Sequence, residues 1–435
     1  MNPSNQMIRR GWAHMTGILG FSFLLVSLMA SSATAQVVAI THGEVHTVSG
    51  PVIQGGTVLM EDGLITAVGR DVEIPAGARI IDARGKIVTP GLFDSSTRLG
   101  ITEVGSYQGT SDGSSGNPRM SAAFNVTEGI NPNTTLIPVA RVEGITRAVV
   151  APGGGASIIA GTSALIDLQG TRLSDLVQKS PLAMYAVIGE RGANYEGGAR
   201  PLALMRLREI FSDVLDYVDH GEAFLAGNWR EYSLSRMDLE ALIPVVQGQR
   251  PLVIQVSRAD DILRALALRD EFSLKLVLSG AAEGWMVAQD IAMADVPVMT
   301  KAASNLPSFE SLGASYENVA RMQAAGVKVI LASFDGYNVR NLKMDAGLAV
   351  SYGLPHEEAL RAVTLTPAEV WGVADRIGSL EAGKVGDVVV WSGDPFELMT
   401  SVEHVFIDGE EISYETRQKA LLEKYRRLDS RPPWK

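Results

Sequence analysis

Apolar residues in the central part of the chain form short runs that alternate with helix-like patterns. The runs are rich in Val, Ile and Leu, as in buried strands, and are expected at residues 86–93, 146–151, 161–168, 182–188, 252–256, 274–278, 296–299 and 328–332. Helical spacing is clearest over residues 202–215, 259–269, 284–292, 315–325, 339–352 and 356–364. Eight strands alternating with helices predict an α/β fold of parallel units, closed as a (β/α)8 TIM-like barrel over residues 88–376. An open, doubly wound sheet is the alternative.

The two ends of the chain have a different pattern. Short β-branched runs broken by Asp-Gly turns occupy residues 37–87, and the same pattern returns over residues 386–412. We therefore expect one small β-sandwich built from residues 36–87 and 377–414. Residues 415–435 predict an amphipathic helical tail that packs on the body or on a second subunit.

The first 35 residues predict a secretory signal peptide. Arg9 and Arg10 precede an apolar run from Gly17 to Ala30, and residues 33–35 (Ala-Thr-Ala) offer a small-x-small cleavage pattern. A membrane anchor is the alternative, but the run is shorter than the roughly 20 residues that a spanning helix needs. The mature protein is thus expected to be periplasmic or secreted, with no membrane contact after cleavage.

The composition excludes some kinds of site and argues against some partners. The chain has no cysteine, which excludes disulfides and thiolate metal sites. Its formal net charge is −11, which argues against nucleic acid as a partner.

Several motifs resemble those of a known family. Residues 88–94 (Val-Thr-Pro-Gly-Leu-Phe-Asp) are similar to the opening of the barrel in the metal-dependent amidohydrolases, and residues 364–369 and 377–390 are similar to the far end of that fold. The resemblance covers nearly the whole mature chain and is strongest to the imidazolonepropionase-like branch. It implies a distorted barrel with a sandwich from both termini. It also implies hydrolysis of C–N bonds by one or two divalent metals, such as zinc, which lower the pKa of a bound water.

The residues at the family's metal-binding positions depart from its pattern. Ser96 and Arg98 stand where the family has a His-x-His pair after the first strand. Gln255 and Gly280 stand where strands 5 and 6 carry histidines, whereas Asp335 matches the aspartate that serves as metal ligand and proton acceptor. The resemblance therefore implies a site whose metal-binding histidines are replaced, and we expect no metal cofactor.

The remaining side chains suggest how such a site is rebuilt. Arg98 is expected to pair with Asp335, because a buried carboxylate without a cation is costly. Ser96 and Gln255 are expected to add hydrogen bonds. Lys301 follows the seventh strand and is expected at the barrel mouth, with a surface position as the alternative.

Three further segments of the sequence are expected near the site. The glycine-rich residues 152–157 favour a tight connection over an anion cradle, because no phosphate-loop motif surrounds them. Residues 102–120 are expected to form a mobile loop over the mouth, either a lid or a disordered segment. His220 is the histidine expected nearest the mouth, although a solvated loop position is favoured.

Two functions remain open. The resemblance implies an exported hydrolase of non-peptide C–N bonds, amide or cyclic amide, with a degenerate metal site. The alternative is a non-catalytic pseudoenzyme that binds a small-molecule ligand. Self-association, or pairing with an active relative, is a further expectation.

Overall fold

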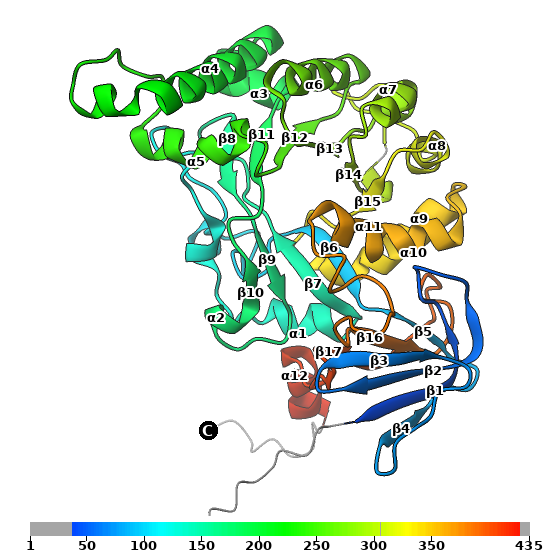
Figure 1. Cartoon of the computed structure of the whole chain (residues 1–435). Helices are drawn as coiled ribbons and strands as arrows, with labels where there is room; N and C mark the ends of the chain where they lie inside the picture. Colours follow the sequence, from blue (N-terminus) through cyan, green and yellow to red (C-terminus); the bar gives the residue numbers. More distant parts are fainter. Residues whose placement is uncertain (1–36, 305, 427–435) are drawn as a thin grey trace, which may run out of the picture. The chain divides into compact units, whose positions relative to one another are not determined.

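The computed structural model describes residues 37–304 and 306–426 (Figure 1). The described residues belong to one compact unit. The predicted signal peptide, residues 1–35, lies outside the described residues. Among the described residues, no helix has both the length and the apolar character needed to cross a membrane.

Strands from both ends of the chain share one eight-stranded sheet. Its order is β18-β17-β16-β5-β1-β2-β3, and β4 also pairs with β1. Its strands are β1 (Val38–Val45), β2 (Ile53–Glu61), β3 (Leu64–Gly69), β4 (Arg79–Asp82), β5 (Ile87–Pro90), β16 (Val388–Trp391), β17 (Val402–Ile407) and β18 (Glu410–Glu411). The antiparallel pairing of β5 with β16 joins the two terminal segments. The predicted union of both termini is thus present, as a single sheet.

The predicted first strand is divided at Gly91. Residues before it form β5 in the terminal sheet, and residues after it form β6 (Leu92–Thr97), which pairs with β7 (Ile145–Val150). A Cβ at Gly91 would overlap the buried Thr146 side chain. A glycine therefore lets the chain pass closely from one sheet into the other.

The central strands form two further sheets, β10-β9-β7-β6 and β15-β14-β13-β12-β11-β8. The remaining strands are β8 (Ile159–Thr162), β9 (Ala164–Asp167), β10 (Val177–Lys179), β11 (Met184–Val187), β12 (Leu252–Val256), β13 (Leu276–Gly280), β14 (Val298–Thr300) and β15 (Val329–Leu331). All eight predicted strand positions carry strands. The first and last meet through hydrogen bonds from Phe334 N to Ser96 O and from Arg98 N to Asp335 O, both 2.9 Å.

The expectation that all central strands are parallel is wrong for the third predicted strand. It corresponds to β8 and β9, which run antiparallel to β11 and β7. Residues 151–163 join Val150 at the end of β7 to its partner Ala164 on β9, and they contain no helix. Parallel neighbours are usually joined by a helical crossover, so a connection without a helix favours an antiparallel return.

Helices follow most of the other central strands. The α-helices of the described residues are α1 (Leu136–Arg141), α2 (Leu173–Leu176), α3 (Gly189–Tyr195), α4 (Arg200–Leu225), α5 (Arg236–Val246), α6 (Ala259–Phe272), α7 (Ala288–Met293), α8 (Asn318–Ala324), α9 (Leu342–Ser351), α10 (His356–Ala362), α11 (Leu365–Val370) and, after the terminal sheet, α12 (Arg417–Arg426). Helix α12 agrees with the predicted helical tail, but its apolar Leu422 and Tyr425 stay largely exposed. The expected packing of the tail therefore remains a prediction.

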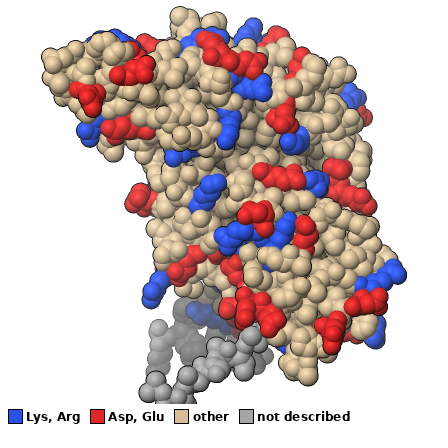
Figure 2. Space-filling model, viewed as in Figure 1, with Lys and Arg blue, Asp and Glu red and all other residues tan. Residues whose placement is uncertain are grey.

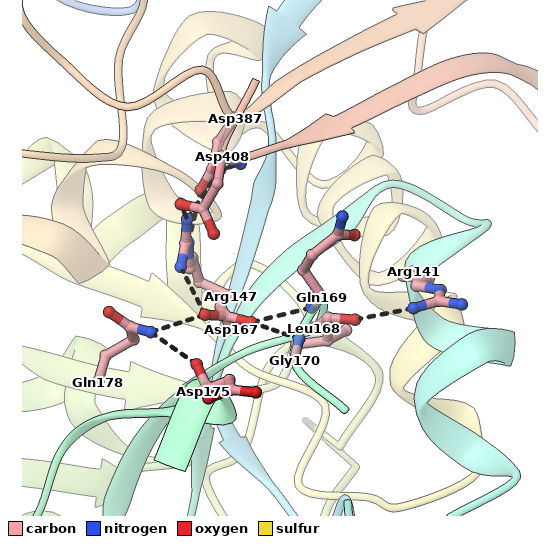
Figure 3. Close-up of polar contacts among 10 residues, drawn as sticks. All are labelled: Arg141, Arg147, Asp167, Leu168, Gln169, Gly170, Asp175, Gln178, Asp387 and Asp408. Carbon is pink, nitrogen blue, oxygen red and sulfur yellow. Dashed lines mark hydrogen bonds and ion pairs between the residues drawn. The ribbon is translucent and has the colours of Figure 1, made fainter. Parts of the chain in front are cut away.

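A buried ion network links the terminal sheet to the central strands (Figure 3). Arg147 on β7 contacts Asp387 through Nε at 2.6 Å and through Nη2 at 2.9 Å. The same guanidinium reaches Asp408 at 2.7 Å and Asp167 on β9 at 3.4 Å. Burial alone lowers the pKa of Arg147, but the neighbouring carboxylates raise it overall. Residues more than 200 positions apart in sequence are thus held by one charged centre.

Candidate functional site

A cavity of about 480 Å³ lies where the central strands end, within the size range typical of small-molecule sites. Side chains from the ends of β6, β11, β12, β13 and β14 line it, together with residues that follow β7 and β15. Four predicted site residues, Ser96, Arg98, Gln255 and Lys301, are brought together in this lining. Folds of parallel β/α units carry their ligand sites at the carboxyl ends of the strands.

The charged side chains of the lining are all basic. Arg98, Arg191 and Lys301 line the cavity, and no Asp or Glu does so. This contrasts with the acidic chain as a whole, and with the face shown in Figure 2, where basic and acidic side chains are interspersed. A concave site with cations of one sign attracts an anion.

Two of these cations rest on the glycine-rich loop after β7. A Cβ at Gly153 would lie 2.5 Å from Nη1 of Arg98, and one at Gly154 would overlap the guanidinium of Arg191. Within the described residues neither guanidinium has a carboxylate within 4 Å. The pKa of Arg98 is lowered first by burial and then by the nearby Arg191. The sequence predicted that this loop only connects two strands. In the structure it also supports two cations that have no carboxylate partner within the described residues.

The predicted ion pair between Arg98 and Asp335 is not formed. The Asp335 carboxylate instead accepts hydrogen bonds from the Tyr337 and Asn338 backbone N–H groups, at 2.9 and 3.1 Å, and from the Asn338 side chain. Those bonds oppose the effect of burial and lower the pKa of Asp335 overall. Asp335 caps the turn before α9, and Phe334 lines the cavity in its place. Its predicted role as proton acceptor stays untested.

Lys301 lies at the mouth as expected. Its Nζ donates to the backbone carbonyl of Ser333 at 3.1 Å, which leaves the other ammonium hydrogens available. The nearby Asp345 carboxylate is already engaged by the N–H groups of Ala302 and Ala303, at 2.9 and 2.8 Å.

The segment predicted to cover the mouth is anchored to the glycine-rich loop. Gly153 N donates to Gly113 O at 2.6 Å, and Ala156 N donates to Ser115 O at 2.9 Å. A Cβ at Gly113 would lie 3.6 Å from the Arg98 guanidinium. This segment therefore packs beside Arg98 and the glycine-rich loop, and none of its residues lines the cavity.

A buried carboxyl lies beneath the site. Asp94, at the middle of β6, accepts hydrogen bonds from Ser96 N at 3.1 Å and from Ser333 N at 3.2 Å. Burial raises the pKa of Asp94 to about 7, although those bonds act in the opposite direction. Asp94 therefore joins the ends of the first and last central strands through a group that titrates near neutral pH.

This carboxyl makes stability depend on pH. Its folded pKa exceeds the unfolded value of about 3.9, so the folded state holds the extra proton between those values. The stabilisation is present at low pH and is lost as the pH rises through about 7. We expect this group to lower the free energy of unfolding by about 2 kcal/mol between pH 5.5 and 8.

Urea unfolding at several pH values measures this effect. Asp94→Asn is expected to flatten the decline, whereas Asp375→Asn, at an exposed position, should leave it unchanged. An unaltered slope in Asp94→Asn would contradict the assignment.

The described histidines lie away from the cavity. Each has a ring nitrogen near a carboxylate: His42 with Asp82, His46 with Glu44, His220 with Asp216, His356 with Asp394, and His404 with Glu411. His220, expected in a loop near the mouth, lies within α4 and stacks on Trp229 with 3.9 Å between ring centroids. The helix extends further than predicted, to Leu225.

The donor set of the lining does not suit a divalent metal. It offers hydroxyls, an amide and three cations, without imidazole or carboxylate. Within residues 37–304 and 306–426, no group of three or more His, Asp or Glu side chains is arranged to hold a metal ion.

Comparisons with known proteins find amidohydrolases among the similar proteins. The amidohydrolase family model matches residues 277–412. The chain is 27% identical to an amidohydrolase from Thermotoga maritima of known structure, covering 86% of this chain and 99% of that one, with a TM-score of 0.79. The chain is a relative of the amidohydrolases. The resemblance read from the motifs is thereby confirmed at the family level.

The curated relatives have similarly low identity. An imidazolonepropionase of Porphyromonas gingivalis is 25% identical over 89% of this chain and 96% of its own length. An imidazolonepropionase of Symbiobacterium thermophilum is 28% identical over 78% and 84%. Amidohydrolase tasK of Hapsidospora irregularis is 24% identical over 81% of this chain, which spans 39% of that protein's length. The imidazolonepropionase-like homology is thus present at low identity.

Proposed function

We propose that this amidohydrolase relative binds a small carboxylate-bearing molecule in a metal-independent site. One observation carries the proposal: the cavity lining contains Arg98, Arg191 and Lys301 with no acidic side chain. Guanidinium groups form two parallel hydrogen bonds to a carboxylate, which gives both attraction and orientation.

The proposal favours the pseudoenzyme over the hydrolase. Hydrolysis of an amide needs an activated water, which a metal or a general base supplies. The lining provides neither a metal ligand set nor an accessible carboxylate. The Asp335 oxygens are occupied by N–H groups of the following turn.

The proposal also covers the closure of the central sheets and the cellular location of the protein. We infer that the two central sheets close into one barrel, supported by the hydrogen bonds between the ends of β6 and β15 and by the likeness to the Thermotoga maritima amidohydrolase. We also infer export, supported by the basic, apolar and small-x-small pattern of residues 1–35. The terminal segments would then form the family's composite β domain.

Metal analysis and ligand binding test the function together. Protein purified without chelator is expected to hold well under one equivalent of zinc, manganese or iron, and excess EDTA should leave its Tm unchanged. Butanoate and glutarate are expected to raise the Tm, because a ligand of the folded state stabilises it. Butylamine serves as a matched cation of similar size and should give no increase.

The outcomes separate the two functions. Stoichiometric metal, or hydrolysis of an N-acyl amino acid that EDTA abolishes, would replace the proposal with a metal hydrolase. Equal Tm changes for butanoate and butylamine would overturn the anion site.

A further inference from the structure

We infer that the ligand carries two separate anionic groups, one bound at the arginine pair and the other at Lys301. This inference rests on the proposed function and extends it to the class of dicarboxylates. The argument starts from how the three cations are distributed around the cavity.

The arginine pair lies on one side of the end of β6. Arg98 directly follows β6, but its guanidinium lies against Gly153, in the loop after the neighbouring β7. Arg191 comes from α3, after β11, and its guanidinium lies against Gly154 in the same loop. Two guanidinium groups that converge on one loop form a site for a single carboxylate.

Lys301 lies on the other side of β6. It follows β14, which pairs with β15, and its Nζ donates to Ser333 O just beyond β15. The next residue, Phe334, hydrogen-bonds through its N–H to Ser96 O on β6. The order of neighbouring strands is therefore β14, β15, β6 and β7. Ser96 on β6 lies between Lys301, which follows β14, and the arginine pair at the loop after β7, and all of them line the same cavity.

Within the described residues, no carboxylate lies within 4 Å of a nitrogen of these three cations. Asp335 and Asp345 are carboxylates that act on Arg98 and Lys301, yet each uses its oxygens on backbone N–H groups and neither lines the cavity. Glu190 and Glu310 line a neighbouring pocket together with Arg191, and Glu310 is engaged by Glu190 N and by Arg200. Asp94 lies beneath the lining and holds Ser96 N and Ser333 N. A monocarboxylate bound at the arginines would leave Lys301 without an anion, whereas a dicarboxylate satisfies both positions.

Affinity measurements with matched probes test this arrangement. Calorimetric or NMR titration would compare butanoate, glutarate and 4-aminobutanoate, which share a four- or five-atom backbone and differ in the second group. Succinate and adipate vary the spacing, and inorganic phosphate offers two charges on one centre. We expect the best dicarboxylate to bind about tenfold more tightly than butanoate, and 4-aminobutanoate to bind more weakly than butanoate.

Two lysine variants locate the second anion. Lys301→Met is expected to bring the ratio of dicarboxylate to butanoate affinity close to one. Lys179→Met is the matched control, because Lys179 also donates to a backbone carbonyl, that of Trp371, and lies outside this cavity. The control should keep the tenfold ratio, and circular dichroism would verify that both variants fold.

Each result has a distinct meaning. Equal affinity for butanoate and every dicarboxylate would overturn the two-anion inference while leaving the proposed carboxylate site intact. Tightest binding of 4-aminobutanoate or of phosphate would also overturn it, since the second group would then be a cation or would share one centre. No binding of any carboxylate would overturn the proposed function itself.

Discussion

Replacing Arg147 by methionine is expected to lower the free energy of unfolding by about 3–5 kcal/mol, because it leaves buried carboxylates without their cation. Asp387 and Asp167 retain only 5% and 4% of their side-chain exposure, so water cannot readily replace the guanidinium. The pKa of Asp167 is already raised by burial, against the opposing effect of Arg147. Removal of the cation should raise it further.

Urea unfolding of the full chain measures this loss. Arg141→Met is the matched control, since Arg141 is half-buried nearby and donates to the Leu168 carbonyl at 3.2 Å without a carboxylate partner (Figure 3). We expect the control to lose about 1 kcal/mol, the net value of one hydrogen bond. Similar losses in both variants would show that the network contributes no more than an ordinary contact.

Removing either arginine from the cavity is expected to weaken glutarate binding by about 10- to 100-fold. A hydrogen bond to a charged group contributes about 1.5–3 kcal/mol, and each guanidinium can make two to one carboxylate. Arg98→Met and Arg191→Met should therefore each weaken binding, with little change in Tm, because neither side chain is paired within the described residues. Arg230→Met, on a side chain paired with Asp213 away from the cavity, should bind glutarate normally.

A glycine substitution tests the same site without removing charge. Gly153→Ala places a methyl group 2.5 Å from Arg98 Nη1, and the end of a long side chain moves aside at small cost to stability. We expect about tenfold weaker glutarate binding, equivalent to about 1.4 kcal/mol. Gly105→Ala is the control, because a Cβ there meets nothing within 4 Å. Normal binding by Gly153→Ala would show that the position of Arg98 is not critical.

Most residues of the site could be predicted from the sequence, but the contacts between their side chains could not. Strand-end positions identified Ser96, Arg98, Gln255 and Lys301, which the structure places around one cavity. Arg191 was missed because it lies in α3, away from the motifs that carry the family resemblance. The signal was the glycine-rich loop after β7, which the sequence interpreted as a tight connection. A glycine can also leave room for a side chain from elsewhere in the chain. The sequence of residues 152–157 does not show which side chain that is.

The sequence by itself determined the alternation of central strands and helices, the union of the two terminal β segments and the resemblance to the amidohydrolases. These follow from hydrophobic periodicity and local motifs, which act over a few residues. Only the tertiary structure decided that the third central strand is antiparallel, that Asp335 caps a turn, and that the Arg98 guanidinium lies against Gly153 beside that of Arg191 at Gly154. Whether the Asp335 carboxylate binds Arg98, 237 positions away in sequence, or the adjacent Tyr337 and Asn338 N–H groups depends on how the folded chain places both residues. The cavity thereby gathers three cations without a carboxylate in its lining.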